Sequence, residues 1–502
     1  MASFRLPCRD VQRFGRRVGA FVAALAIALP AGAAPARVGA VDARSLPRSV
    51  EAALGRGGIP SDAMVAWVQE VDATRPRLAW QADRPVNPAS LMKLVTTYAA
   101  LELLGPAFTW STPVWLQGPI ANGVLAGDVT IKGTGDPKLV LERIWLLLRR
   151  VQQMGVREIR GDIVMDRSAF APGALNPADF DGEPLRPYNA GADALLLNYR
   201  AVILTFTPDA ARGIATVGVE PQLAGVRVDL TVPLAAGPCD DWRGALKADF
   251  TEPARMRLAG AYPASCGEKL WPLAYADPKS YNERALAGIW QEMGGKLDGV
   301  VREGVAPAAL PSFELRSPSL AEVIRDINKL SNNVMAQQLF LTLGATQRGG
   351  SGTPEAAREV VRQWLKGRVG EAAGGAVIIN GSGLSRESRL NAALLGRLLQ
   401  SAWSSPVMPE LMSSLPVSGI DGTLRKSKGP PGRAHLKTGS LRDVVGIAGY
   451  VLADSGRRYI VVGIVNHPNA NAARPALDAI AEWAANDAPA LSPASTRAGD
   501  PP

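Results

Sequence analysis

The chain has 502 residues, of which 47% are hydrophobic and 20% are charged, and its formal net charge is +9. This length is too great for one compact core, so we expect at least two domains, and the composition is that of a globular rather than a disordered protein. No block of Lys and Arg is interleaved with aromatic residues, so the sequence does not predict nucleic-acid binding. A mildly basic surface would suit an anionic cell wall, but a generic surface explains the charge equally well.

Residues 1–33 have the features of a secretory signal peptide. Five arginines against one aspartate precede residue 20, the apolar run 18–29 follows, and small residues lead up to Ala33, after which we expect cleavage. The apolar run is too short to span a bilayer comfortably. The pair Arg16-Arg17 would suit a twin-arginine route, but the residues after it favour ordinary secretion. No later stretch is long and apolar enough to cross a membrane, so we expect a periplasmic protein with no transmembrane anchor in the mature chain.

Residues 34–109 are expected to form the first segment of a catalytic domain. Met64–Val71 and Leu78–Ala82 predict two strands joined by a turn. A helix is predicted to follow at about 90–104, because apolar residues recur at helical spacing after Pro88 and the sequence Gly-Pro ends the pattern at 105–106.

Ser90 and Lys93 lie at the start of this predicted helix, three residues apart and so on the same face. This spacing can hold a hydroxyl nucleophile and an amine base within hydrogen-bond reach of each other without a histidine. It is the only Ser-x-x-Lys in the chain. Taken alone, the pattern is better explained by a capped, amphipathic core helix than by a catalytic pair.

Residues 110–276 read as a separate β-rich unit inserted into the catalytic domain. Gly, Pro and Asp punctuate short β-like runs at Thr112–Leu116, Gly127–Lys132, Gly161–Met165, Ala201–Thr207, Gly213–Glu220 and Val226–Val232. The loop at 132–137, Lys-Gly-Thr-Gly-Asp-Pro, lacks the Walker lysine position, and we interpret it as a turn. Cys239 and Cys266 are the only cysteines that remain after the signal is removed. In an oxidising compartment they favour one disulfide, the alternative being two inert thiols.

Residues 277–486 are expected to form the second catalytic segment, and residues 487–502 a disordered tail. Helical periodicity occurs at Tyr281–Met293, Leu320–Leu343, Ala356–Lys366 and Leu390–Trp403, and a final helix is predicted at Pro475–Ala485. Val444–Leu452 and Arg458–Val465 predict an antiparallel hairpin. Strands at both ends with helices between them indicate the α+β class, an antiparallel sheet with a helical lobe.

Two further motifs follow the Ser-x-x-Lys sequence. Ser331-Asn332-Asn333 opens a helical pattern, and Lys437-Thr438-Gly439 lies at the start of the C-terminal β-rich stretch. In this order, Ser-x-x-Lys, Ser-Asp-Asn and Lys-Thr-Gly are the motif trio of penicillin-binding proteins and class A β-lactamases, with Asn332 here replacing the Asp. With these motifs and the long insertion, the chain resembles a D-alanyl-D-alanine carboxypeptidase/endopeptidase of the penicillin-binding protein 4 type, peptidase family S13.

The resemblance implies a penicillin-binding-protein/β-lactamase-like transpeptidase fold with a large β-rich inserted domain. It also implies a serine carboxypeptidase, with endopeptidase activity as a further option, that acts on peptidoglycan stem peptides and is acylated by β-lactam antibiotics. In this scheme Ser90 attacks the D-Ala–D-Ala carbonyl and Lys93 takes its proton. Ser331 relays a proton to the leaving D-Ala, and Asn333 orients Lys93 and the substrate amide. No cofactor is implied, and no Cys/His cluster has the spacing of a zinc site.

The third motif is expected to bind the substrate. By resemblance, Lys437 and Thr438 hold the terminal carboxylate, and the backbone N–H groups of Ser90 and Ser440 form the oxyanion hole. Gly439, which has no side chain, is expected to let the substrate backbone lie close to the strand. A free lysine has a pKa of about 10.4 and is a base near pH 7 only where burial or a neighbouring cation disfavours its charge. We expect Lys437 to supply part of that effect on Lys93.

The sequence offers three alternatives to this function. A Ser-His-Asp hydrolase would use His435 or His467, but the chain has no Gly-x-Ser-x-Gly sequence. A class A β-lactamase would need a deacylating glutamate, for which Glu387 is a superficial candidate, but we interpret Glu387 as part of the first turn of the helix at 390–403. A wall-binding protein with an inactive site is disfavoured because all three motifs are intact.

Overall fold

The computed structural model describes residues 45–173 and 176–487. The predicted signal peptide at 1–33 and almost all of the predicted tail lie outside the described residues. Asp487, the first residue of that tail, is buried and accepts hydrogen bonds from Ser455 and from Tyr459. Ordered structure therefore continues through Asp487, one residue further than the composition of the tail indicates. None of the helices in the described ranges is both long and apolar enough to cross a membrane.

A five-stranded antiparallel sheet brings the two ends of the described chain together. Its strand order is β2-β1-β22-β21-β20. The strands are β1 (Met64–Glu70), β2 (Leu78–Trp80), β20 (Ala434–Leu441), β21 (Val444–Leu452) and β22 (Arg458–Asn466). β1 and β2 form one predicted hairpin, β21 and β22 form the other, and β1 pairs with β22 along its whole length. Both predicted hairpins are thus confirmed, and β20 is an edge strand.

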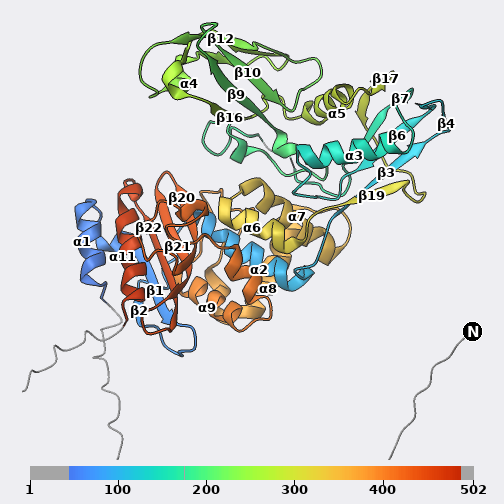
Figure 1. Ribbon diagram of the computed structural model, residues 1–502. Helices are drawn as coiled ribbons and strands as arrows, with labels where there is room; N and C mark the ends of the chain where they lie inside the picture. Colours follow the sequence, from blue (N-terminus) through green and yellow to red (C-terminus); the bar gives the residue numbers. More distant parts are fainter. Residues whose placement is uncertain (1–44, 174–175, 488–502) are drawn as a thin grey trace, which may run out of the picture. The chain divides into compact units, whose positions relative to one another are not determined.

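Helices cover both faces of this sheet (Figure 1). Successive residues of a strand point to opposite faces, so Met64 and Ala66 of β1 lie in one apolar core while Val65 and Trp67 lie in another. The first core is closed by α1 (Arg48–Arg56) and α11 (Arg474–Ala485). The second is closed by the helical lobe, which comprises α2 (Met92–Leu104), α6 (Leu320–Leu330), α7 (Asn333–Arg348), α8 (Pro354–Val369), α9 (Ala392–Trp403) and α10 (Met408–Ser414). This architecture confirms the predicted α+β class.

The helix pattern expected at Leu320–Leu343 is two helices. Ser331 ends α6 in the left-handed region, with φ 56° and ψ 37°, and Asn332 caps the start of α7. The apolar periodicity continues across this break because both helices bury one side in the same core. The short helices α1 and α10 were not predicted.

The first part of the insertion contains two sheets and two helices. One sheet has the order β18-β8-β6-β3-β19 and the other β17-β7-β5-β4. The strands are β3 (Ser111–Gln117), β4 (Ile120–Ala121), β5 (Val124–Leu125), β6 (Asp128–Lys132), β7 (Glu158–Ile159), β8 (Ile163–Asp166), β17 (Lys296–Leu297), β18 (Val301–Glu303) and β19 (Phe313–Arg316). β6 pairs in parallel with β8, a connection that requires a crossover, and α3 (Leu141–Gln153) provides it. Sequence reasoning missed α3.

The last strands of this part bear on where the insertion ends. β17, β18 and β19 follow α5 (Tyr281–Glu292) in sequence, yet they pair with β7, β8 and β3 of the insertion. Composition alone places the boundary at residue 276. Because strands that share a sheet fold as one unit, we propose instead that the insertion extends to about residue 316.

The second part of the insertion is a five-stranded sheet of order β15-β12-β10-β9-β16 with a three-stranded neighbour, β11-β14-β13. Its elements are β9 (Ala201–Asp209), β10 (Ile214–Glu220), β11 (Arg227–Val228), β12 (Thr231–Ala235), α4 (Trp242–Ala245), β13 (Ala248–Asp249), β14 (Arg255–Leu258), β15 (Tyr262–Pro263) and β16 (Lys269–Ala274). The single strand expected at 226–232 is divided between β11 and β12.

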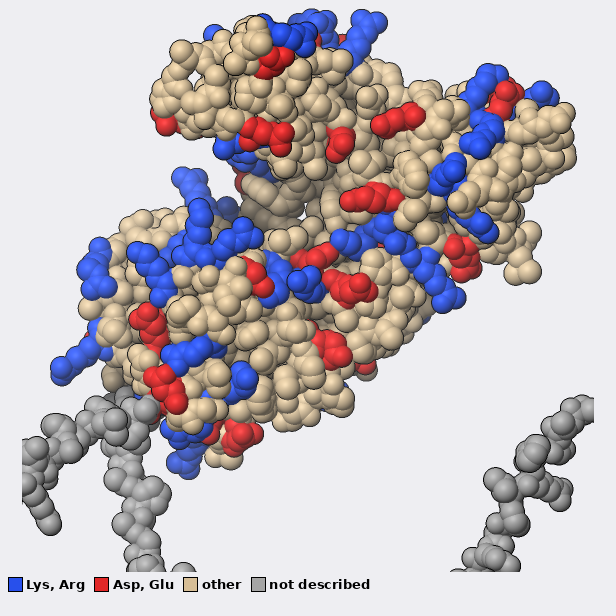
Figure 2. Space-filling model, in the orientation of Figure 1, with Lys and Arg blue, Asp and Glu red and all other residues tan. Residues whose placement is uncertain are grey.

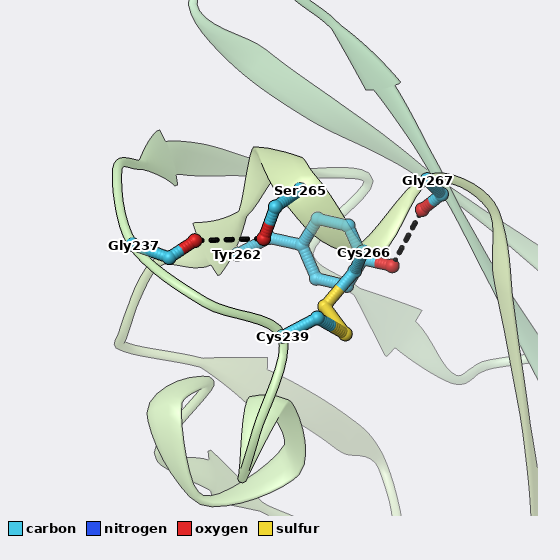
Figure 3. Close-up of a disulfide and its surroundings, with 6 residues drawn as sticks. All are labelled: Gly237, Cys239, Tyr262, Ser265, Cys266 and Gly267. Atoms are coloured by element: carbon cyan, nitrogen blue, oxygen red, sulfur yellow. Dashed lines mark hydrogen bonds between the residues drawn. A yellow bond between two sulfur atoms is a disulfide. The ribbon is translucent and has the colours of Figure 1, made fainter.

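A disulfide between Cys239 and Cys266 joins two segments of this part, as predicted (Figure 3). Two hydrogen bonds hold the surrounding loop. Ser265 Oγ donates to the carbonyl of Gly237 at 2.7 Å, and the Tyr262 hydroxyl donates to the carbonyl of Gly267 at 2.8 Å.

Candidate active site

Ser90 lies in a single 3₁₀ turn, Ala89–Leu91, that leads directly into α2. Asn87 fixes this turn from three directions. Its Oδ1 accepts the Ala89 N–H at 2.9 Å, its Nδ2 donates to the carbonyl of Ser385 at 2.9 Å, and its N–H donates to Asn466 Oδ1 at 2.8 Å. The position of Ser90 at the start of a helix, as the sequence predicts, is thus set by contacts with β22 and with the loop before α9.

Lys93 is fully buried, and its Nζ contacts three oxygen atoms. It lies 2.9 Å from Ser90 Oγ, 2.6 Å from Asn333 Oδ1 and 2.7 Å from the carbonyl oxygen of Ser382. A neutral amine has two N–H donors and one lone pair. Two of the three neighbours can only accept a hydrogen bond, and the third, the Ser90 hydroxyl, can donate one. A charged lysine donates to all three oxygens. A neutral lysine fits the same contacts, with its two N–H groups donated to Asn333 and Ser382 and its lone pair directed at Ser90.

The electrostatics of the site favour this neutral form. Burial, and secondarily the positive charge of Lys437, hold the pKa of Lys93 well below its ordinary value. Burial also lowers the pKa of Lys437, to about 7. No carboxylate in the described part of the chain contributes to either pKa. Keeping both buried amines protonated without a counter-ion would cost free energy. Lys93 can therefore be neutral and act as a base near neutral pH.

The second motif lies at the junction of α6 and α7. Asn332 accepts the Met335 N–H at 3.0 Å and so caps α7. Asn and Asp are equally good at this position, which explains why Asn332 can replace the aspartate of the common motif. The cap orients the first turn of α7, where Asn333 bonds Lys93. The left-handed backbone of Ser331 brings its Oγ to 3.0 Å from Lys437 Nζ, so each of the two buried lysines contacts one side chain of the second motif.

The third motif lies on β20, and within the described ranges only the first half of the outer edge of this strand is paired with another segment. The loop at 416–418 pairs with the first half of this edge, where the N–H of Leu436 donates to the carbonyl of Pro416 at 2.9 Å. N–H groups of alternate residues on a strand point the same way. The N–H groups of Thr438 and Ser440 therefore point outward as well, toward the uncovered half of the edge. Lys437 points inward and is fully buried.

Gly439 has a different role from the one expected. A side chain at this position would lie 2.8 Å from the carbonyl oxygen of Pro88 and 3.3 Å from Ala89 Cβ. The missing side chain thus makes room for the protein's own Ser90 turn, not for a substrate. Gly383 does the same from the opposite side, because a Cβ there would lie 1.9 Å from the Ala89 carbonyl oxygen. Two glycines allow the Ser90 turn to be held between β20 and the loop at 380–386.

A cavity of about 780 Å³ opens over Ser90. Residues of the motifs line its base, and several others that sequence reasoning missed line its walls: Phe180, Asp181, Tyr188, Leu330, Leu384, Arg386, Leu441 and Arg442. Arg386 follows the sequence Asn-Gly-Ser-Gly-Leu-Ser at 380–385, whose two glycines indicate a tight turn but not a cavity wall. Ser382, whose carbonyl bonds Lys93, belongs to the same turn and was also missed, because any residue can supply a carbonyl.

Part of the wall comes from the insertion. Asp181 accepts hydrogen bonds from the Tyr188 hydroxyl at 2.8 Å and from Asn189 Nδ2 at 2.7 Å. Partial burial raises the pKa of Asp181, but these hydrogen bonds outweigh it and lower the pKa below its ordinary value. The segment is tied to α7, the helix that begins with Asn333, because Gln338 both accepts from the N–H of Asp193 and donates to its carbonyl, each at 2.8 Å.

The geometry does not support the rival catalytic sites. Within residues 45–173 and 176–487, neither histidine hydrogen-bonds to Ser90 or Lys93, and His467 Nδ1 instead accepts the N–H of Asn469. Glu387 lines a different cavity, of about 340 Å³. Our assignment of Glu387 to a first helical turn is wrong, because α9 begins at Ala392 with Asn391 as its cap.

Comparison with known proteins decides the family. The profile of the D-Ala-D-Ala carboxypeptidase 3 (S13) family matches residues 46–487. The chain belongs to this family. The family membership, the enzyme class and the fold inferred from the three motifs are therefore confirmed.

Curated relatives in this family match over most of their length. A D-alanyl-D-alanine carboxypeptidase of Actinomadura sp. is 28% identical over 95% of this chain and 94% of its own. Carboxypeptidase DacB of Mycolicibacterium smegmatis is 30% identical over 79% of this chain and 75% of its own. Among solved structures, penicillin-binding protein 4 (DacB) of Haemophilus influenzae is 20% identical, with a TM-score of 0.69 over 87% of this chain and 99% of that one. The same protein has been solved in complex with a β-lactam, which matches with a TM-score of 0.63.

Proposed function

We propose that this family member is a serine-type D-Ala-D-Ala carboxypeptidase in which Ser90 forms the acyl-enzyme with peptidoglycan stem peptides. The observation that carries the proposal is the buried Lys93 Nζ, 2.9 Å from Ser90 Oγ and held by two acceptors, Asn333 Oδ1 and the Ser382 carbonyl. A serine hydroxyl needs a base to attack a carbonyl near neutral pH. Lys93 is the buried base within reach.

Acylation would begin with transfer of the Ser90 proton to Lys93 as Oγ attacks the carbonyl of the penultimate D-Ala. The bond to the terminal D-Ala breaks, and its nitrogen must receive a proton as it leaves. Ser331 is suited to deliver that proton, because its hydroxyl lies 3.0 Å from Lys437 Nζ and lines the same cavity as Ser90. The proton on Lys93 would replace the one that Ser331 gave up, which leaves Lys93 neutral. Water then attacks the ester, and Lys93 accepts a proton from the water and passes it to Ser90 Oγ, so the free acid and the Ser90 hydroxyl are regenerated.

The uncovered half of β20 would bind the substrate. The outward N–H of Ser440, with that of Ser90, is suited to the developing oxyanion, the interaction that contributes most in acyl transfer. The charge of Lys437 and the hydroxyl of Thr438 would hold the terminal carboxylate. An extended peptide added along this edge satisfies backbone groups on both strands.

The proposed setting follows from the substrate. We place the protein in the periplasm, exported by the signal predicted at 1–33, with stem peptides and β-lactams as its ligands. On the face drawn in Figure 2, basic and acidic side chains are interspersed, as expected for a protein whose partners are small peptides rather than nucleic acid.

Labelling with a fluorescent penicillin tests this function against its rivals. A carboxypeptidase of this kind forms a long-lived adduct and releases D-Ala from a D-Ala–D-Ala peptide. Rapid turnover of the penicillin would instead indicate a β-lactamase. Absence of labelling in the folded protein would indicate a different nucleophile or an inactive site and would refute the proposal.

A further inference from the structure

We propose that Thr423 is a positioning residue that sets the hydroxyl of Thr438 for recognition of the terminal carboxylate. This inference rests on the function proposed above. The side-chain oxygens of the two threonines are 2.7 Å apart. Thr423 lies on the loop before β20 and belongs to none of the three motifs, so sequence reasoning did not single it out.

The loop that carries Thr423 is fixed to the end of α6. The carboxylate of Asp421 contacts Lys329 Nζ at 2.6 Å and accepts the N–H of Val417 at 2.8 Å. Gly422 follows with φ +54°, and a side chain there would lie 2.5 Å from the carbonyl oxygen of Lys329. Leu424, on the other side of Thr423, is buried. Thr423 is thus exposed at the tip of a well-anchored turn.

This anchoring connects Thr423 to the second motif. Lys329 lies two residues before Ser331 in the last turn of α6. The turn at 421–424 therefore keeps its position relative to Ser331 as well as to β20. The side chain of Thr423 is short, so the backbone of this turn fixes the position of its hydroxyl relative to Thr438.

The number of protons on the two threonine hydroxyls limits which hydrogen bonds they can donate. Each threonine hydroxyl has one proton, and either can donate to the other. A carboxylate can only accept, so Thr438 must use its proton for the substrate. In the structure the Thr438 hydroxyl donates to Thr423 Oγ1. A bound carboxylate would take the Thr438 proton in a hydrogen bond, and Thr423 would then donate to the oxygen of Thr438 in return. Without Thr423, the Thr438 hydroxyl can rotate among its staggered positions, and part of the binding free energy is spent in orienting it.

The contact acts on the carboxylate, which is present both in the bound substrate and in the transition state. Loss of such an interaction raises KM and leaves kcat unchanged. One hydrogen bond of this kind corresponds to a change of about threefold to tenfold. A substrate whose terminal carboxylate is amidated has no anion to bind and should not respond.

The test compares Thr423→Val, which keeps the shape and removes the hydroxyl, with Thr423→Ser, which keeps the hydroxyl. Thr216→Val, at an exposed threonine on β10, is a matched control. On a free-acid D-Ala–D-Ala peptide, Thr423→Val should raise KM about threefold to tenfold with kcat within about twofold. Thr423→Ser and Thr216→Val should both behave like the native enzyme. Penicillin acylation should slow by the same factor as the peptide reaction.

Three results would overturn the inference: an unchanged KM in Thr423→Val, an equal loss on the amidated substrate, or a Thr423→Ser variant as impaired as the valine variant. If the native enzyme is labelled at Ser90 and releases D-Ala, any of these results would refute the role of Thr423 but not the proposed function. A native enzyme that is neither labelled nor active would refute the proposed function, and the role of Thr423 with it.

Discussion

Replacement of Lys437 by methionine should remove carboxylate recognition while making the protein more stable. Methionine fills a similar volume, so the change deletes the charge without leaving a large cavity. Truncating the charged member of a buried pair typically costs about 2–5 kcal/mol, which corresponds to about 30-fold to several thousandfold in kcat/KM on a free-acid peptide. Penicillin carries a carboxylate in the matching place, so its acylation rate should fall in parallel.

The pH dependence of this reaction provides an independent readout. Lys93 must be neutral to act as a base, so kcat/KM should fall as the pH drops through the lowered pKa of Lys93. Lys437 must be charged to bind the carboxylate, and its pKa is about 7 because it is buried. With a free-acid substrate, kcat/KM should therefore also fall above about pH 7. With an amidated substrate, or with Lys437→Met, this alkaline fall should be absent.

Stability distinguishes loss of function from loss of fold. Burial lowers the pKa of Lys437 from 10.5 to about 7. Below about pH 7 the lysine is charged in both the folded and the unfolded state, and the cost of burying that charge is present in full. Between about 7 and 10.5 the unfolded chain binds the proton while the folded protein does not, so the stability of the native enzyme rises with pH. Lys437→Met should thus have a higher free energy of unfolding at pH 7, by on the order of a few kcal/mol, and this advantage should shrink toward pH 10.

Assays of the free-acid and amidated peptides, with thermal unfolding of both proteins, check these expectations together. Equal loss on the two substrates would mean that Lys437 acts through the pKa of Lys93 or through the shape of the site. If kcat/KM of the Lys437→Met variant still falls above about pH 7, a group other than Lys437 controls that fall. Either result would refute the assignment of Lys437 as the carboxylate anchor.

Three further predictions follow from other parts of the structure. Lys93→Arg replaces the neutral amine by a guanidinium that cannot release its proton, so penicillin acylation measured by stopped flow should fall by orders of magnitude, and a near-normal rate would show that another group is the base. The Cys239–Cys266 bridge closes a loop with a sequence separation of 27. Replacing both cysteines by serine should therefore lower the unfolding free energy of the insertion by about 3–4 kcal/mol in denaturant titrations. An unchanged free energy would mean that the bridge does not form. Asn332→Ala removes the cap of α7 and should cost about 1 kcal/mol and slow acylation, whereas Asn332→Asp should be near native; equal effects of the two would contradict the capping role.

The sequence predicted the contacts around Lys93 better than it predicted the cavity above Ser90. Ser90 and Lys93 are one helical turn apart, so their proximity follows from local geometry alone. Asn333 and Lys437 come from distant elements, and only the ordered motifs indicated that they belong to the same site. The cavity wall formed by Phe180 and its neighbours depends on how the insertion packs against α7, for which the sequence has no periodic signal.

Gly439 shows how a missing side chain can make room for a different neighbour from the one expected. Its lack of a side chain indicated a close approach of another backbone, which the structure bears out. The approaching chain is the Ser90 turn, which lies against β20 through tertiary packing. The helix α3 was missed although its signal is in the sequence. Its buried residues Ile144, Leu147, Leu148 and Val151 recur at helical spacing, but the surrounding short strands led us to assign the whole region to a β-rich unit.

The central claim is that Ser90 is the residue acylated, and peptide mapping of the penicillin adduct tests it most directly. The native protein should carry one penicilloyl group, located by mass spectrometry on the peptide that contains Ser90. The Ser90→Ala variant should unfold at the same temperature as the native protein and should carry no penicilloyl group. An adduct on any other residue, or labelling of Ser90→Ala at full strength, would contradict the account.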